Sequence, residues 1–175
     1  MISSKYAIDL RLKRDQIARF DAYPFSLPAV RYLDILEFHP AVTFIVGENG
    51  SGKSTLLEAI AVSCGCNAEG GSKNFRFGTH ASHSSLHEYI RIAKGFRRPK
   101  DGYFFLVKAG SQFIIATHSP ILMAYPNADI YACSTYGLQR IDYQETEHYK
   151  VMHDFVVNPK RMLDVLLAPQ EEHLT

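Results

Sequence analysis

Apolar positions along the chain fall into short runs and alternations that are typical of β-strands. Residues 6–12 alternate apolar with charged side chains, which predicts a half-exposed strand, and residues 33–38 predict a second strand that returns before Pro40. Three further segments are nearly continuous apolar runs, as expected for buried parallel strands: 41–46, 111–117 and 128–133.

Helical patterns separate and follow these strands. Residues 56–61 are good helix formers with apolar side chains at helical spacing, and the segment 86–94 predicts a second, short helix. Two closing helices are predicted at 146–156 and 159–167, the second with a proline in its first turn. Because strands alternate with helices, we expect one α/β domain over residues 1–175, with a mostly parallel sheet flanked by helices and an N-terminal antiparallel β segment.

Composition narrows the class of protein. Apolar residues make up 46% and charged residues 21% of the chain, which is ordinary for a globular protein and argues against disorder. Lysine plus arginine (19) nearly equals aspartate plus glutamate (18), so no overall field attracts nucleic acid or a membrane surface. No apolar run approaches a membrane span, the N-terminus lacks the apolar stretch of a signal peptide, and the three cysteines cannot all pair. We therefore expect a cytoplasmic protein.

A glycine-rich segment joins the first buried strand to the first helix. It reads Gly47, Glu48, Asn49, Gly50, Ser51, Gly52, Lys53, Ser54 and Thr55, which fits the phosphate-binding pattern G-x-x-x-x-G-K-[ST]. In such a loop the backbone N–H groups cradle phosphate, Lys53 reaches the outer phosphates and the Ser54 hydroxyl ligates Mg²⁺. A glycine-rich turn that binds nothing is the alternative. The strand before the loop and the helix after it favour a nucleoside triphosphate site.

A second polar motif follows the buried strand at 111–117, where Thr117, His118 and Ser119 come directly after four apolar residues. A single histidine in this position is more often structural than catalytic. Ligands in open α/β sheets, however, bind at the carboxyl ends of the strands, which is where this triplet lies.

The two motifs together resemble those of ABC-type ATPases, and the loop with its helix is similar to the SMC/RecF-like side of that group. Further matching segments are similar to small bacterial stand-alone AAA/ABC-type ATPases: 36–40, 119–126, 143–149, 158–159 and 161–163. The resemblance covers residues 25–167. It implies that the protein binds ATP and Mg²⁺, that His118 contacts the γ-phosphate, and that two subunits pair head to tail around two nucleotides. Action on nucleic acid or on a partner protein is implied by analogy alone.

Several parts of such an ATPase cannot be identified between Lys53 and His118. These are a Q-loop glutamine, a helical lobe, a signature segment and an apolar strand that ends in Asp-Glu. The acids of this interval are Glu58, Glu69, Glu88 and Asp101, and none of them ends an apolar strand. Our hypothesis is that a block is absent between residues 105 and 106. We expect such a chain to bind ATP weakly, to hydrolyse it barely and to be unable to complete a partner's site.

Two other functions remain open. The same phosphate loop could serve a small-molecule kinase, with Arg97 and Arg98 as a lid over the transferred phosphoryl group. It could also serve a non-catalytic subunit that responds to nucleotide.

Other candidate sites are weaker. A zinc site would use some of Cys64, Cys66, His80, His83 and His87, but a polar surface loop is the favoured interpretation. A solvated turn is likewise favoured over a nucleic-acid contact at 97–100. Tyr23, Phe25 or Tyr32 could stack on adenine, although burial in the core is favoured for each.

Overall fold

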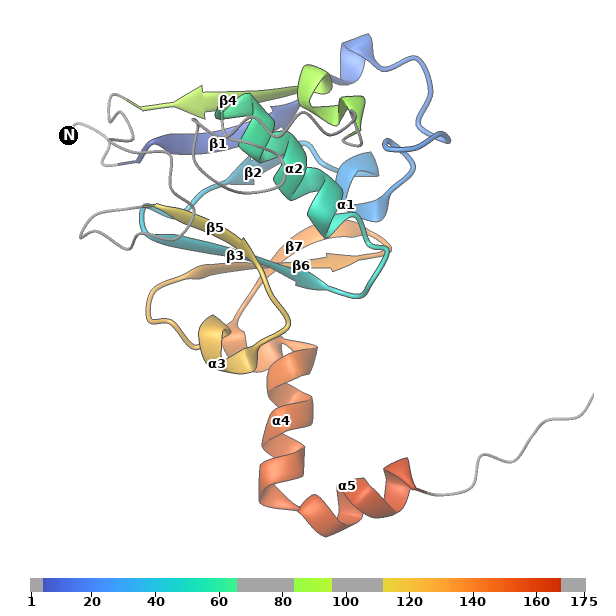
Figure 1. Cartoon of the computed structure of the whole chain (residues 1–175), viewed down its shortest axis with the longest axis vertical. Helices are drawn as coiled ribbons and strands as arrows, with labels where there is room; N and C mark the ends of the chain where they lie inside the picture. The colour runs from blue at the N-terminus through green and yellow to red at the C-terminus, as the bar shows by residue number, and fades with distance from the viewer. Residues whose placement is uncertain (1–4, 66–83, 96–111, 168–175) are drawn as a thin grey trace, which may run out of the picture.

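The computed structural model describes residues 5–65, 84–95 and 112–167, and it contains two β-sheets (Figure 1). The strands are β1 (Ala7–Leu12), β2 (Ile35–Glu37), β3 (Val42–Gly47), β4 (Ile90–Lys94), β5 (Phe113–Ala116), β6 (Asp129–Ser134) and β7 (Gly137–Ile141). The α-helices are α1 (Pro28–Arg31), α2 (Lys53–Ser63), α3 (Pro120–Met123), α4 (Glu147–Val157) and α5 (Pro159–Leu166). Short 3₁₀ turns lie at η1 (Arg14–Gln16), η2 (Ser85–Tyr89) and η3 (Tyr143–Glu145).

The larger sheet has the strand order β5-β3-β6-β7. Its central strand β3 pairs in parallel with β5 and with β6, and β7 adds an antiparallel edge to β6. Five consecutive residues of β3, 42–46, are buried, as expected for a strand that is covered on both faces. The three buried runs of the sequence therefore form the parallel part of this sheet, and the predicted α/β class is confirmed. Strand β7 was not predicted, because its sequence mixes polar and apolar residues without a clear alternation.

The smaller sheet is antiparallel, with the order β2-β1-β4, and contains the two predicted N-terminal strands. Its third strand corrects the prediction of a helix at 86–94, where the chain forms the turn η2 and then β4. In β4, Ile90 and Ile92 alternate with Arg91, and Ile92 lies opposite Leu10 of β1. Pairing with β1 and burial of Ile90 thus override the helix propensity of this segment.

The main core lies between the two sheets, where α2 packs against strands of both (Figure 1). Its largest fully buried side chains come from β1, β2, β3, α2, η2 and the segment after β2: Leu10, Leu36, Phe38, Ile45, Leu56 and Leu86. A second buried cluster lies on the opposite face of the parallel sheet and includes Phe44 of β3 and Met123 of α3. The central sheet is therefore covered on both faces, by α1 and α2 on one side and by the short α3 on the other.

Gln112, just before β5, joins the two sheets through its side-chain amide. Its Oε1 accepts hydrogen bonds from the backbone N–H groups of Tyr6 (3.1 Å) and Ala7 (2.9 Å). Its Nε2 donates to the carbonyl oxygens of Ala7 (2.8 Å) and His39 (2.9 Å). One side chain thus satisfies backbone groups at the start of β1 and in the connection between β2 and β3.

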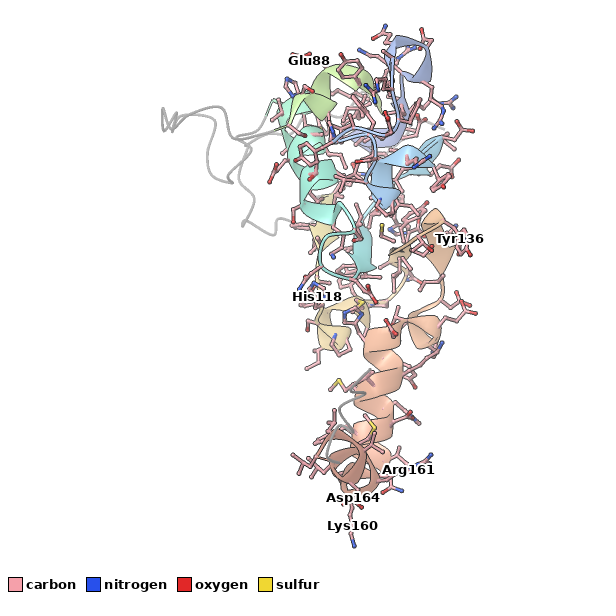
Figure 2. All side chains as sticks on the ribbon, turned by 90° about the vertical axis from the view of Figure 1, so that its right-hand side faces the viewer. Glu88, His118, Tyr136, Lys160, Arg161 and Asp164 are labelled. Atoms are coloured by element: carbon pink, nitrogen blue, oxygen red, sulfur yellow. The ribbon has the colours of Figure 1, made fainter. Side chains whose placement is uncertain are left out.

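Helices α4 and α5 form an arm that extends away from the sheets, and Figure 2 shows Lys160, Arg161 and Asp164 of α5 at its far end. Both helices lie where the sequence predicts them, but neither contains a buried residue. In the part of the chain that the structure describes, no helix is long and apolar enough to cross a membrane. The position 105/106, the turn at 97–100 and the segment 66–83 lie outside the described residues.

We predict that Gln112→Ala lowers the free energy of unfolding by about 1–3 kcal/mol, because it leaves half-buried backbone groups of Tyr6, Ala7 and His39 without this partner. Gln139→Ala is the matched control, since Gln139 is exposed on β7, and it should change the stability by less than about 0.5 kcal/mol. Urea unfolding followed by circular dichroism measures both. Equal effects of the two substitutions would contradict the role given to Gln112.

Candidate functional site

The loop at 47–55 connects β3 to α2 and turns through three glycines with positive φ. Gly47 has φ 139°, Gly50 has φ 81° and Gly52 has φ 96°, a region that other residues rarely adopt. Two of them also lack space for a side chain. A Cβ on Gly47 would lie 2.6 Å from the carbonyl oxygen of Cys133, and one on Gly52 would lie 3.0 Å from Cβ of Leu27. The backbone of this loop therefore requires glycine for conformation and for packing.

Lys53, the first residue of α2, is buried, and its ammonium group lies inside the loop. Its Nζ donates to the carbonyl oxygen of Gly47 at 2.7 Å, to the carbonyl oxygen of Glu48, and to Oγ of Ser51 at 3.4 Å. An ammonium has three donors and no acceptor, so these oxygens occupy its full capacity. A phosphate that binds Lys53 has to displace these neutral oxygen acceptors. The exchange is favourable, because a hydrogen bond from an ammonium to a charged phosphate oxygen is stronger than one to a neutral oxygen.

Neighbouring elements fix the middle of the loop. The carbonyl oxygen of Ser51 accepts hydrogen bonds from the backbone N–H of Ala29 in α1 (3.1 Å) and from Sγ of Cys133 in β6 (3.3 Å). Burial raises the pKa of the Cys133 thiol, so the thiol keeps the proton that it donates. The loop is therefore held from two sides before any ligand arrives.

A cavity of about 450 Å³ opens beside the loop. Loop and helix residues line one side of it, the end of β5 lines another, and two residues before α1 complete the lining: Asn49, Gly50, Gly52, Lys53, Ser54, Thr55, Ala116, Thr117, His118, Tyr23 and Leu27. A second hollow, beside α5, lies far from these groups. The cavity at the loop thus joins the two polar motifs of the sequence, and no carboxylate is among the described residues that line it.

Hydroxyl groups lie at the start of α2, where a cation bound to a phosphate chain would be. Ser54 is exposed and lines the cavity with Thr55, whose Oγ1 is 3.5 Å from the Tyr23 hydroxyl. A hydroxyl is a hard oxygen ligand that suits Mg²⁺, which commonly takes most of its remaining ligands from phosphate and water. The donor set fits a magnesium ion that arrives with its nucleotide.

The parallel pairing of β3 with β5 brings His118 to the loop. Ala116, the last residue of β5, pairs with Ile45 of β3. His118 therefore lies at the same edge of the sheet as the loop that begins at Gly47. The His118 side chain is exposed and lines the cavity, and Figure 2 shows it where the body of the molecule meets α4. Its Nδ1 lies 3.0 Å from Nε2 of His148, in the first turn of α4.

His148 is half-buried. Burial lowers its pKa first, and the nearby His118 and Lys53 lower it further, against an opposite effect of Glu147. The ring is therefore neutral at pH 7, when it can share a proton with His118. Because the pKa is lower in the folded state than in the unfolded state, this neutral ring contributes stability above pH 6.5 that is lost as the pH falls through the folded-state value.

The structure revises the aromatic candidates. Phe25 packs edge-on against Phe20 and Tyr89 beside the core, as favoured. Core burial was wrong for Tyr23 and Tyr32, which are 63% and 56% exposed. Tyr23, one of the adenine candidates of the sequence, does line the cavity. The contacts of Cys133 and His148 have no signal in the sequence, because they join distant segments.

The remaining candidates are largely outside the structure. Cys66, His80 and His83 of the weighed zinc site lie outside the described residues, as do Arg97 and Arg98. Within residues 5–65, 84–95 and 112–167, no group of three or more histidines, cysteines and acids is arranged to hold a metal ion.

Comparison with known proteins supports the resemblance seen in the sequence. The family model described as "AAA domain" matches residues 24–146, which is more than half of the chain and includes the loop and His118. Neither the curated proteins nor the solved structures gave a match to the chain.

We predict that Gly47→Ala is more damaging than Gly50→Ala. The first substitution combines positive φ with a backbone contact of 2.6 Å, and should lower the free energy of unfolding by about 2–4 kcal/mol. The second has positive φ but open space around the new Cβ, and should cost about 1 kcal/mol. Chemical unfolding of both variants measures this difference. Similar losses would mean that β6 does not restrict the loop at Gly47.

Proposed function

Because this chain belongs to the AAA domain family of ABC/SMC-like P-loop ATPases, we propose that it binds MgATP at residues 47–55 and retains little or no hydrolytic activity. The observation that carries the proposal is the cavity that Lys53 and His118 line together. Family membership shows a P-loop nucleotide-binding domain. We propose the roles of the individual residues, the binding of Mg²⁺ and the loss of hydrolysis.

The geometry suggests how the triphosphate lies. The backbone N–H groups of Asn49–Gly52 and the first turn of α2 cradle the β-phosphate, helped by the positive end of the helix. Lys53 exchanges its bonds to the carbonyl oxygens of Gly47 and Glu48 for bonds to phosphate oxygens. Ser54 ligates Mg²⁺, and His118 meets the γ-phosphate at the opposite side of the cavity. This arrangement binds and orients the nucleotide.

Hydrolysis needs in addition a group that activates water, which is commonly a carboxylate. No carboxylate lines the cavity among the described residues, and no Asp-Glu pair ends an apolar strand between Lys53 and His118 in the sequence. Within the described part of the chain, β5 pairs with β3 alone, and its four residues are only half-buried. An edge strand of this kind is what would remain if a neighbouring acid-bearing strand were lost with the block that we propose is absent between residues 105 and 106.

The lack of a signature segment also bears on whether two copies of the chain pair. Without a signature segment the chain has nothing to supply to a second nucleotide site, so we propose that it binds ATP as a single domain, without head-to-tail pairing. We place it in the cytoplasm, where ATP and a reduced Cys133 thiol are both maintained. Neither a nucleic acid nor a partner protein is assigned.

Lys53→Ala should weaken ATP binding about 10- to 100-fold, because it removes a charge-assisted contact to phosphate. The matched control is Lys160→Ala, which removes the same charge at the far end of the arm and should leave the affinity within about twofold (Figure 2). Isothermal titration with ATP in the presence of Mg²⁺ measures both. If wild-type protein and Lys53→Ala give the same isotherm, the nucleotide site is not at this loop.

Purified wild-type protein with MgATP should release ADP no faster than the Lys53→Ala variant does, well below the roughly 1–10³ s⁻¹ of ordinary enzymes. The assay is run with and without small hydroxyl-bearing and phosphate-bearing acceptors. Turnover that needs Lys53 but no acceptor would show that a water-activating group is present after all. Turnover that needs both Lys53 and an added acceptor would favour the alternative function of a small-molecule kinase.

A further inference from the structure

The contact between His118 and His148 joins the nucleotide cavity to a residue that neither sequence motif includes. The two side chains come from positions 30 residues apart, and the family match ends at residue 146, before His148. Their ring nitrogens are 3.0 Å apart and their ring centroids 5.1 Å apart. We propose that His148 is a positioning residue that holds the proton of His118 on Nε2, so that His118 can donate to the γ-phosphate. This inference rests on the proposed function and extends it to a residue of α4.

The hydrogen bond between the two rings determines which nitrogen of His118 carries a proton. Two neutral imidazoles in hydrogen-bond contact share one N–H between the facing nitrogens, so one ring donates and the other accepts. If His148 donates from Nε2, the Nδ1 of His118 is the acceptor, and His118 must carry its own proton on Nε2. If His118 donates instead, its Nε2 presents a lone pair that repels phosphate oxygen. Only the first arrangement gives neutral His118 a donor for the γ-phosphate, and the phosphate and His148 therefore favour the same tautomer.

His148 is held firmly enough to impose this choice. It lies in the first turn of α4, two residues after Thr146, whose side chain is buried and caps the helix. Thr146 Oγ1 donates to the carbonyl oxygen of Tyr143 at 2.7 Å and accepts from the backbone N–H of Tyr149 at 3.2 Å. The rings of Tyr143 and Tyr149 pack edge-to-face with centroids 4.8 Å apart, which fixes this turn further. His118, by contrast, is exposed and follows the last strand residue by two positions.

The charges around the pair agree with a neutral His148. Lys53 and His118 disfavour its protonation, and Glu147 beside it favours protonation more weakly than burial opposes it. A metal bridge does not explain the contact, since the described residues offer no third ligand to complete a site. If both rings were protonated, two cations would face each other and neither facing nitrogen could accept. The hydrogen bond therefore requires that at least one ring is neutral.

The test compares ATP with ADP, because only ATP carries the phosphate that His118 meets. His148→Phe should weaken ATP binding about fivefold and leave ADP binding within about twofold. His148→Gln, whose amide can still donate to His118 Nδ1, should recover most of the ATP affinity. His153→Phe is the matched control, since His153 is exposed on the same helix, and it should change neither affinity.

Two further measurements separate positioning from a structural effect. In a His118→Ala background, His148→Phe should have no additional effect on ATP affinity. In wild-type protein with ATP, the ¹⁵N NMR spectrum of the histidines should show His118 protonated on Nε2, and His148→Phe should give a mixture of tautomers.

The outcomes distinguish this inference from the one on which it rests. If Lys53→Ala leaves ATP binding unchanged, the proposed function fails. If Lys53→Ala acts as expected but His148→Phe leaves the ratio of ATP to ADP affinity unchanged, the positioning role fails alone. An equal loss of both affinities in His148→Phe, or an effect that persists without His118, would show that His148 acts on the fold and also overturns the proposal.

Discussion

The parallel pairing of β3 with its two neighbours is the constraint on which the rest of the structure depends. Parallel strands end at the same edge of a sheet, so the loop after β3, His118 after β5 and Cys133 near the end of β6 meet in one place. The pairing Gly47↔Cys133 leaves no space for a side chain at Gly47, and the pairing Ile45↔Ala116 places His118 beside the cavity. The site is thus a consequence of strand register as much as of its own residues.

The loop already has the shape that the proposed phosphate site needs. Three positive-φ glycines set its curvature, and the hydrogen bonds from Ala29 and Cys133 to Ser51 hold it in place. Lys53 already lies at the centre, bonded to backbone carbonyls that a phosphate chain can replace. Little conformational ordering is then left for the ligand to impose, which favours affinity. The cost is conformational entropy, because glycine loses more backbone freedom on folding than other residues do, and the burial of β3 and α2 offsets it.

In the function that we propose, nucleotide binding is separate from hydrolysis, because no carboxylate is among the described residues that line the cavity. The contact between His118 and His148 connects the segment after β5 to the first turn of α4. From that turn α4 leaves the body of the molecule (Figure 1). Val151, Phe155 and Val156 are exposed along it. The His118 side of the cavity and the base of the arm are therefore in direct contact.

The sequence by itself determined the features that arise from neighbouring residues. The loop at 47–55, the buried strands, the helices of the arm and the α/β class follow from local periodicity and from glycine and lysine at set spacings. The tertiary structure decided what depends on residues far apart. Residues 90–94 form a strand because they pair with β1, and β7 forms the edge of the larger sheet because it pairs with β6. Tyr23 lies at the cavity and not in the core. It also brought His148 to His118 across 30 residues of chain. Such contacts leave no periodic trace in the sequence, because register and packing between distant segments fix them only when the sheets assemble.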